Sequence, residues 1–111
     1  MVKRGDIVLV DLDPGKGSEQ KKTRPALIIQ HDSLNKYGDT TIIIPITSTI
    51  YDKDYAMHVR IKGFGLKKEG TLKVEHIRSI DKKRIKKHVG KVNEDILDKV
   101  KTAFLKTCDY Y

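Results

Sequence analysis

Two short stretches of the sequence combine residue types that can bind a phosphate group. In the first, Arg24 directly precedes Pro25, whose ring favours an extended backbone at the residue before it. A guanidinium held at the start of a strand can clamp a phosphate with two hydrogen bonds, although many strand-edge arginines have no such role. The second stretch, Pro45-Ile46-Thr47-Ser48-Thr49, follows an isoleucine run, and we expect Pro45 to end strand pairing there. Its hydroxyls can hold a phosphate or a ribose, or they can cap a turn.

The basic side chains are concentrated in the second half of the chain. The formal net charge is +8, whereas residues 1–52 carry equal numbers of acidic and basic side chains. The excess therefore lies beyond residue 52, most densely over residues 82–87. This asymmetry indicates an anionic partner, either nucleic acid or an acidic protein. A solubilising lysine surface is the alternative interpretation.

Several other kinds of site and location have no pattern in this sequence. The four histidines lack the spacing of a metal site, so we expect no metal and no cofactor. The loop at 14–25 does not have the order of a phosphate-binding loop, although a basic loop of this length can fold over a polyanion. The single cysteine, Cys108, cannot form an internal disulfide. With no export signal and no apolar span, these features predict a cytoplasmic protein without membrane contact.

Six short segments rich in β-branched residues are predicted to be strands, because glycine, proline and aspartate residues separate them. They are Ile7–Leu12, Ala26–Gln30, Thr40–Ile46, His58–Lys62, Thr71–Glu75 and Ile77–Ile80. The continuous isoleucine run in the third segment predicts a central strand that is covered on both faces. Many short strands with such turns are typical of a sandwich or a small barrel.

The C-terminal part of the sequence changes to a helical period. An amphipathic helix is predicted there, with Asn93 as its N-cap and an apolar face formed by Ile96, Leu97, Val100, Ala103 and Phe104. A shorter helix is predicted from Asp32 or Ser33 to Gly38. The 111 residues suffice for one domain, residues 1–111. The predicted fold is therefore mostly β: a small barrel with a short inserted helix and a C-terminal helix.

Three motifs, in order, resemble those of the MazF/PemK-type toxin family. The first is divided into Arg4-Gly5-Asp6-Ile7, Asp13-Pro14, Gly17-Ser18-Glu19-Gln20 and Arg24-Pro25-Ala26-Leu27-Ile28-Ile29-Gln30. The second is Pro45-Ile46-Thr47-Ser48, and the third is Glu75-His76-Ile77-Arg78-Ser79-Ile80-Asp81. Each motif alone is weak, but their order and spacing hold from residue 3 to the terminal helix, which is essentially the whole chain.

The resemblance implies a sequence-selective, metal-independent endoribonuclease that acts on single-stranded RNA as the toxin of a toxin–antitoxin pair. It also implies an SH3-like barrel, a homodimer whose RNA groove crosses the dimer interface, and an acidic antitoxin protein that occupies this groove. Metal-free RNA cleavage can use the ribose 2′-OH as nucleophile, which predicts 2′,3′-cyclic phosphate and 5′-OH ends. A toxin of the same fold that binds DNA gyrase without catalysis, and a barrel that binds nucleic acid without cutting it, are the alternatives.

Site residues follow from the resemblance position by position. Arg24 and Thr47 match the family's catalytic residues. Some relatives place an Arg and an Asp two residues apart in acid and base roles, and these positions are Lys73 and Glu75 here, so Glu75 is the predicted general base. His76 stands where relatives often have Gln, a difference that can alter base preference. The residues predicted to bind RNA are Ser18, Glu19, Gln20, Ser48, Lys73, His76 and Arg78.

Overall fold

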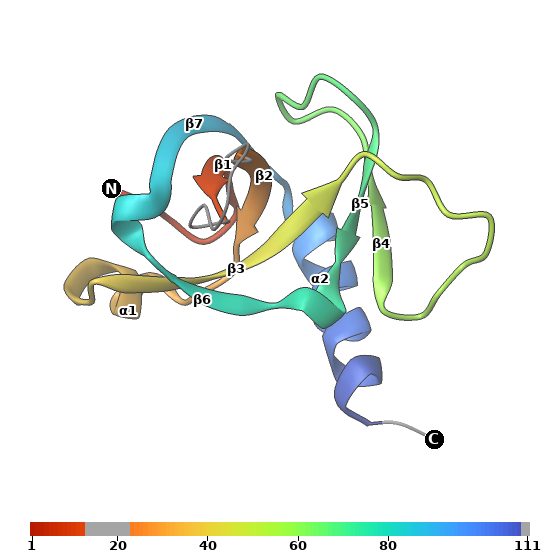
Figure 1. The fold of residues 1–111 in the computed structure, drawn as a ribbon. Coiled ribbons are helices and arrows are strands. Elements are labelled where there is room, and N and C mark those ends of the chain that lie inside the picture. Colours follow the sequence, from red (N-terminus) through yellow and green to blue (C-terminus); the bar gives the residue numbers. More distant parts are fainter. Residues whose placement is uncertain (13–22, 110–111) are drawn as a thin grey trace, which may run out of the picture.

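The computed structural model describes residues 1–12 and 23–109. Short strands make up most of it, with one short helix inserted after the second strand and a longer helix at the C-terminal end (Figure 1). In chain order the elements are β1 (Asp6–Asp11), β2 (Thr23–Ile28), α1 (Asp32–Tyr37), β3 (Thr40–Thr47), β4 (His58–Ile61), β5 (Gly70–Lys73), η1 (Val74–His76), β6 (Arg78–Asp81), η2 (Lys82–Arg84), β7 (Ile85–Lys91) and α2 (Glu94–Cys108).

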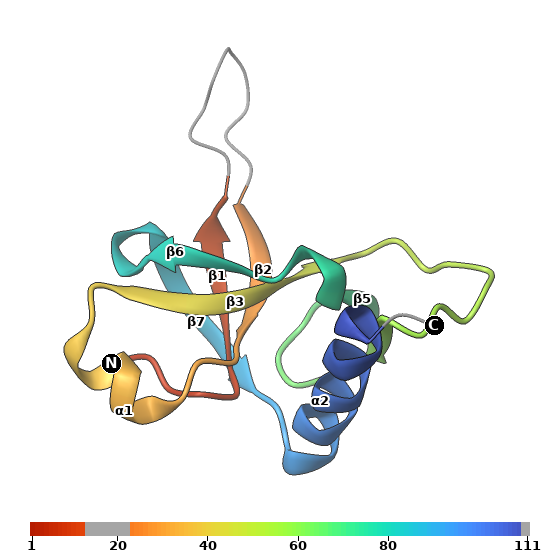
Figure 2. The same ribbon diagram turned by 90° about the horizontal axis from the view of Figure 1, so that it is seen from below.

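The long strand β3 organises the sheet. One edge of β3 pairs with β2, while the opposite edge pairs first with β6, at residues 40–43, and then with β5, at residues 46 and 47. The sheet continues from β2 to β1 and β7 on one side and from β5 to β4 on the other, with every pairing antiparallel. In two perpendicular views β3 crosses the molecule, with β1, β2, β6 and β7 curled around one end (Figures 1 and 2). The predicted mostly-β barrel is confirmed.

Strands β1, β2 and β3 bury side chains on both faces. Ile7 and Ile44 belong to the apolar cluster that α2 covers, whereas Val8 and Ile43 belong to a second cluster inside the curled end of the sheet. Successive side chains of a strand point to opposite faces, so each of these strands contributes to two cores. Burying one such aliphatic side chain stabilises the fold by about 1.5–3 kcal/mol. The predicted coverage of the isoleucine strand on both faces is confirmed.

Both predicted helices are present. In α2 the side chain of Asn93 accepts a hydrogen bond from the backbone of Ile96 at 3.1 Å, which confirms the predicted N-cap. Four members of the predicted apolar face are buried, but Phe104 lies at its margin and stays exposed. In α1 the buried side chain of Asn35 accepts a hydrogen bond from the Thr41 hydroxyl at 2.7 Å, which ties the inserted helix to β3.

The predicted end of pairing at Pro45 is wrong. Pro45 lies opposite Ala26 within the β2–β3 ladder, and β3 continues to Thr47. Proline is tolerated because it falls in the gap on the other edge of β3, where β6 has ended at Ile43 and β5 begins at Ile46. A residue without an N–H therefore removes no hydrogen bond there.

Two predicted strands need correction, and one strand was not predicted. β2 begins at Thr23 rather than Ala26, because Arg24 and Pro25 pair with Val10 and Leu9 of β1. The predicted strand Thr71–Glu75 ends at Lys73, and the following residues form the single turn η1. β7 was not predicted because its sequence is polar and mostly exposed, and its pairing with β1 holds it in place. Among the described residues, no helix has the length and apolar character needed to cross a membrane.

Candidate functional site

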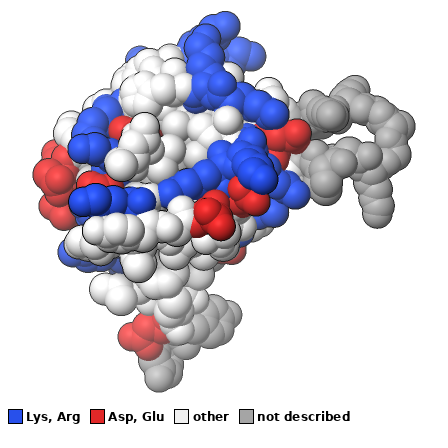
Figure 3. Space-filling model, turned by 90° about the vertical axis from the view of Figure 1, so that its left-hand side faces the viewer, with Lys and Arg blue, Asp and Glu red and all other residues white. Residues whose placement is uncertain are grey.

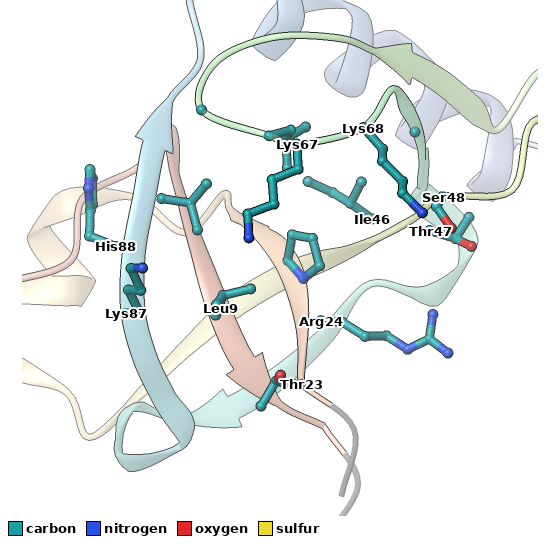
Figure 4. Close-up of a pocket in the computed structure, with 15 residues that line it drawn as sticks. Leu9, Thr23, Arg24, Ile46, Thr47, Ser48, Lys67, Lys68, Lys87 and His88 are labelled. Carbon is teal, nitrogen blue, oxygen red and sulfur yellow. The ribbon is translucent and has the colours of Figure 1, made fainter. Parts of the chain in front are cut away.

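Arg24 and Thr47 lie on neighbouring strands, each two residues beyond the last pair of the β2–β3 ladder. Ala26 of β2 lies opposite Pro45 of β3, and Arg24 precedes Ala26 by two residues while Thr47 follows Pro45 by two. In antiparallel strands, two steps in opposite directions keep residues across from each other and on one face of the sheet. The Arg24 side chain extends from β2 toward the end of β3, where Thr47 and Ser48 lie (Figure 4). Folding thus brings together two residues that are 23 positions apart in the sequence.

Two cavities meet at this pair. The first, of about 630 Å³, has apolar residues such as Pro25 and Ile46 in its lining and basic ones at its rim: Lys67 and Lys68 from the β4–β5 connection, and Lys87 and His88 from β7 (Figure 4). The second, of about 580 Å³, is lined by Leu12, Pro45, Lys73, His76 and Arg78. Arg24 and Thr47 line both cavities. They therefore lie at the junction of one elongated basic surface.

The densest positive charge of the chain adjoins this surface. Residues 82–87 form η2 and the start of β7, where Lys83, Lys86 and Lys87 are exposed. Lys87 also lines the first cavity. On the face shown in Figure 3, lysine and arginine side chains are numerous, and acidic side chains lie among them. Lys87 thus connects the basic segment 82–87 to the cavity that Arg24 and Thr47 line.

The hydroxyl group of Thr47 caps a turn. It accepts a hydrogen bond from the backbone N–H of Thr49 at 3.2 Å and donates one to the Thr49 hydroxyl, also at 3.2 Å. The Thr71 hydroxyl donates to the carbonyl of Thr49 at 2.9 Å, which anchors the turn to β5. The turn fixes the Thr47 oxygen but not its proton, because a hydroxyl can rotate to donate to a ligand. Turn capping and ligand binding, the two interpretations of this motif, are therefore compatible.

Most of the predicted RNA-binding residues lie around the two cavities. Ser48 lines the first, and Lys73, His76 and Arg78 line the second together with Arg24 and Thr47. Ser18, Glu19 and Gln20 lie outside the described residues. Among residues 1–12 and 23–109, no three or more His, Cys, Asp and Glu side chains are grouped as metal ligands.

Glu75, the predicted general base, lines neither cavity. Its carboxylate lies 3.1 Å from Nε2 of His58, with 30% of the Glu75 side chain and 10% of the His58 side chain exposed. A carboxylate only accepts hydrogen bonds, so this contact places the imidazole proton on Nε2. Burial raises the pKa of Glu75, but the hydrogen bond from His58, a backbone hydrogen bond and the imidazoles of His58 and His76 outweigh it and bring the pKa below its ordinary value. Glu75 is therefore ionised at neutral pH and is a weaker proton acceptor than an ordinary glutamate.

The rim lysines Lys67 and Lys68 were not predicted as site residues. They follow a tight turn in which Gly63, Phe64 and Gly65 all have positive φ, at 90°, 55° and 92°. This turn packs directly on β7: a Cβ on Gly65 would overlap the carbonyl of Val89, and a Cβ on Gly90 would overlap the carbonyl of Phe64. The closely spaced glycines before a lysine pair were the available sequence signal, but the contact with Gly90 required the fold.

Comparison with known proteins gives consistent matches. Residues 3–107 match the model of the family described as PemK-like, MazF-like toxin of type II toxin–antitoxin system. An endoribonuclease in complex with its cognate antitoxin, from a Mycobacterial species, superposes with a TM-score of 0.82 at 18% identity, covering 100% of this chain and 98% of that one. The MazE–MazF Form-II structure from Deinococcus radiodurans gives 0.82 at 24% identity, with 99% and 97% covered. The Mycobacterium tuberculosis toxin MazF-mt6 gives 0.80 at 19% identity, with 96% and 98% covered. At such identities these similarities show a shared fold.

Gly90→Ala is predicted to dislodge the turn that carries the rim lysines. A methyl group at position 90 overlaps a backbone carbonyl rather than a movable side chain, so we expect a loss of about 1–3 kcal/mol of unfolding free energy. Gly63→Ala is the matched control. Its added methyl group meets no atom within 4 Å, so this variant loses only the free energy needed to place alanine in a left-handed backbone conformation. Urea denaturation measures both variants, and NMR shifts of Lys67 and Lys68 report the displacement. A Gly90→Ala variant as stable as the wild type would contradict the close contact.

Glu75→Gln is predicted to destabilise the fold in a pH-dependent way. Because the pKa of Glu75 is lowered in the folded state, its stabilisation is complete above the ordinary glutamate value of 4.5 and is lost as the pH falls through the lower folded value. We expect the variant to lose about 0.5–1 kcal/mol near pH 7 and to approach the wild type near pH 3. Urea denaturation at both pH values measures the difference, with Glu69→Gln, from the more exposed Arg60–Glu69 pair, as the control. A destabilisation that is equal at both pH values would contradict the ionic contribution.

Proposed function

The chain belongs to the PemK-like, MazF-like toxin family of type II toxin–antitoxin systems, and we propose that it is a sequence-selective endoribonuclease that cleaves single-stranded RNA. The proposal rests on the position of Arg24 and Thr47, which lie on the neighbouring strands β2 and β3 and line both cavities together with several basic side chains. A similar fold is found in a Mycobacterial endoribonuclease, which supports the assignment.

The proposed cleavage uses the RNA's own 2′-OH and needs no metal ion. The 2′-oxygen passes its proton to solvent water and bonds to the adjacent phosphorus, the bond from phosphorus to the 5′-oxygen breaks, and the 5′-oxygen takes a proton from water. Arg24, which carries a permanent positive charge, stabilises the negative charge that develops on the phosphorane oxygens. Thr47 donates its hydroxyl proton to a non-bridging oxygen and holds the reacting atoms in line. The products are a 2′,3′-cyclic phosphate and a 5′-OH.

The two cavities accommodate RNA on both sides of the scissile phosphate. Lys67, Lys68 and Lys87 meet phosphates on one side, and Lys73 and Arg78 meet them on the other. Each phosphate neutralised by a protein cation releases counterions, so binding should weaken steeply with salt. Unpaired RNA fits this surface because its bases are free to leave the backbone and enter the cavities, whereas those of a duplex are stacked and paired.

Glu75 is better assigned to positioning His58 than to removing the 2′-OH proton. Its carboxylate is engaged by the imidazole at 3.1 Å, its pKa is lowered mainly by that hydrogen bond against the opposing effect of burial, and it lines neither cavity. The role predicted from the resemblance therefore has no support in its location.

We also propose an acidic antitoxin as the protein partner, because the basic surface that suits RNA suits an acidic chain equally well. One of the similar structures contains its cognate antitoxin. The homodimer that the family resemblance implies, the cytoplasmic location and the single domain over residues 1–111 remain predictions.

Arg24→Ala is predicted to abolish turnover while RNA binding persists. Removing one preorganised group that stabilises a developing oxyanion typically costs about 10²–10³ in kcat, whereas the remaining lysines retain most of the affinity. Purified protein is incubated with a long unstructured RNA in excess EDTA, cut sites are mapped by primer extension, and fragment ends are read by mass spectrometry. Arg60→Ala is the control, because Arg60 is exposed and lines neither cavity of the site.

Three outcomes would contradict this function. Cleavage of the matching all-deoxy oligonucleotide at a comparable rate rules out attack by the 2′-OH. Cleavage by Arg24→Ala at the wild-type rate removes Arg24 from the chemistry. Intact RNA with the wild type favours a barrel that only binds nucleic acid or a toxin that binds DNA gyrase, and a gyrase supercoiling assay separates these two.

Glu75→Gln is predicted to retain most of its turnover number. Loss of a general base costs about 10²–10⁴ in rate, and we expect a decrease well below that range because the carboxylate faces His58. Single-turnover cleavage at saturating enzyme measures the chemical step alone. A decrease within the general-base range, with unchanged folding, would restore Glu75 as the base.

A further inference from the structure

Three aromatic rings pack together, and one of them lies near Lys73, which lines the second cavity. Tyr51 and Tyr55 come from the connection between β3 and β4, and His58 begins β4. The ring centroids of Tyr51 and Tyr55 lie 4.7 and 5.1 Å from that of His58 and 6.0 Å from each other. Each pair is tilted or edge-to-face, which is the favourable geometry for aromatic contacts. Each ring is therefore held by two neighbours.

The cluster is held in place at His58 and is exposed to solvent at Tyr55. The His58 side chain is only 10% exposed and is held by Glu75 at 3.1 Å. Tyr55, in contrast, is 43% exposed. An aromatic ring that is supported from below but not covered presents a preorganised flat surface, and a ligand that stacks on it pays little ordering entropy.

Lys73 connects the cluster to the proposed scission site. Its Nζ lies 5.8 Å from the centroid of the Tyr51 ring, and the same residue lines the second cavity with Arg24 and Thr47. His76 and Arg78 line that cavity as well. An RNA strand that extends from Arg24 through the second cavity would thus pass the cations Lys73 and Arg78 and then reach the tyrosines.

We propose that Tyr51 and Tyr55 form a stacking subsite for an unpaired nucleobase of the substrate RNA, at the end of the second cavity away from Arg24 and Thr47. The inference rests on the proposed function and adds a binding position to it. Alternation of a cationic groove with aromatic rings is how proteins hold single-stranded nucleic acid. Every base has a stacking face, so the subsite supplies affinity with little sequence preference. RNA is favoured over an acidic peptide because Lys73 joins the rings to the cavity that contains the proposed reacting residues.

Binding of an uncleavable RNA tests the subsite. The probe spans the mapped cut site and carries 2′-deoxyribose at the nucleotide before the cut, so that it lacks the nucleophile. We expect Tyr55→Ala to weaken binding about 5- to 100-fold, the range for loss of one base–aromatic stack. Tyr55→Leu, which keeps an apolar side chain without a ring, should weaken it similarly, and Tyr55→Phe should bind like the wild type. Tyr37→Ala, at an 80% exposed tyrosine on α1, is the matched control and should have no effect.

Abasic nucleotides locate the contact. Each nucleotide beside the cut is replaced in turn by an abasic residue, and binding is measured for the wild type and for Tyr55→Ala. At the stacked position the two changes should be non-additive, because either one removes the same contact. The chain has five tyrosines and no tryptophan, so RNA binding should also quench tyrosine emission, and less so in Tyr55→Phe.

The outcomes separate this inference from the proposed function. Wild-type affinity in Tyr55→Leu, or additive effects at every abasic position, overturns the subsite while RNA cleavage stands. A loss of binding by Tyr55→Ala to a peptide of alternating glutamate and leucine, with RNA binding unchanged, assigns the rings to a protein partner and also overturns it. If the wild type neither binds nor cuts RNA, the proposed function itself fails.

Discussion

The whole structure depends on the pairing of β3 on both of its edges. One edge holds β2 along the segment from Ile43 to Pro45, and the other edge holds β6 and then β5. This arrangement is possible because the change of partner falls at Pro45, where no backbone N–H needs an acceptor. The strand that ends in Thr47 is thereby placed next to the strands that carry Arg24, Lys73 and Arg78. The candidate site therefore results from the pairing of β3 with β2, β5 and β6, and not from loops with a structure of their own.

Much of the fold could be predicted because local sequence and tertiary structure agree. The β-branched runs formed strands, the isoleucine run was buried on both faces, and Asn93 capped α2. Arg24 and Thr47 were chosen from motifs, and the strand register then explained their proximity. β7 escaped prediction because it is polar and depends on pairing with β1, which leaves no apolar alternation in its sequence.

Contacts between distant segments set the limit of sequence reasoning at the site. The role of Glu75 could not be judged without knowing that His58 lies against it, since the two residues are 17 positions apart. The aromatic cluster was equally hidden, because Tyr51, Tyr55 and His58 have no spacing that identifies a platform before the connection folds back. Lys67 and Lys68 reach the cavity only because a glycine turn rests on Gly90. In each case the sequence shows the residue, but only the fold shows which other residue it contacts.

The proposed reacting residues lie on paired strands, whereas the proposed recognising residues are divided between strands and connections. Lys73, Arg78 and Lys87 lie on β5, β6 and β7, but Ser48, Tyr55 and Lys68 belong to connections and His76 to a single turn. Substitutions in connections are tolerated more readily than changes within a ladder whose side chains fill two cores. Under the proposed function, a change of sequence preference therefore needs substitutions only in the connections, while the strands that carry Arg24 and Thr47 stay unchanged. Proteins that share 18–24% of their residues with this chain have the same fold over nearly all of it, so the barrel itself tolerates wide sequence change.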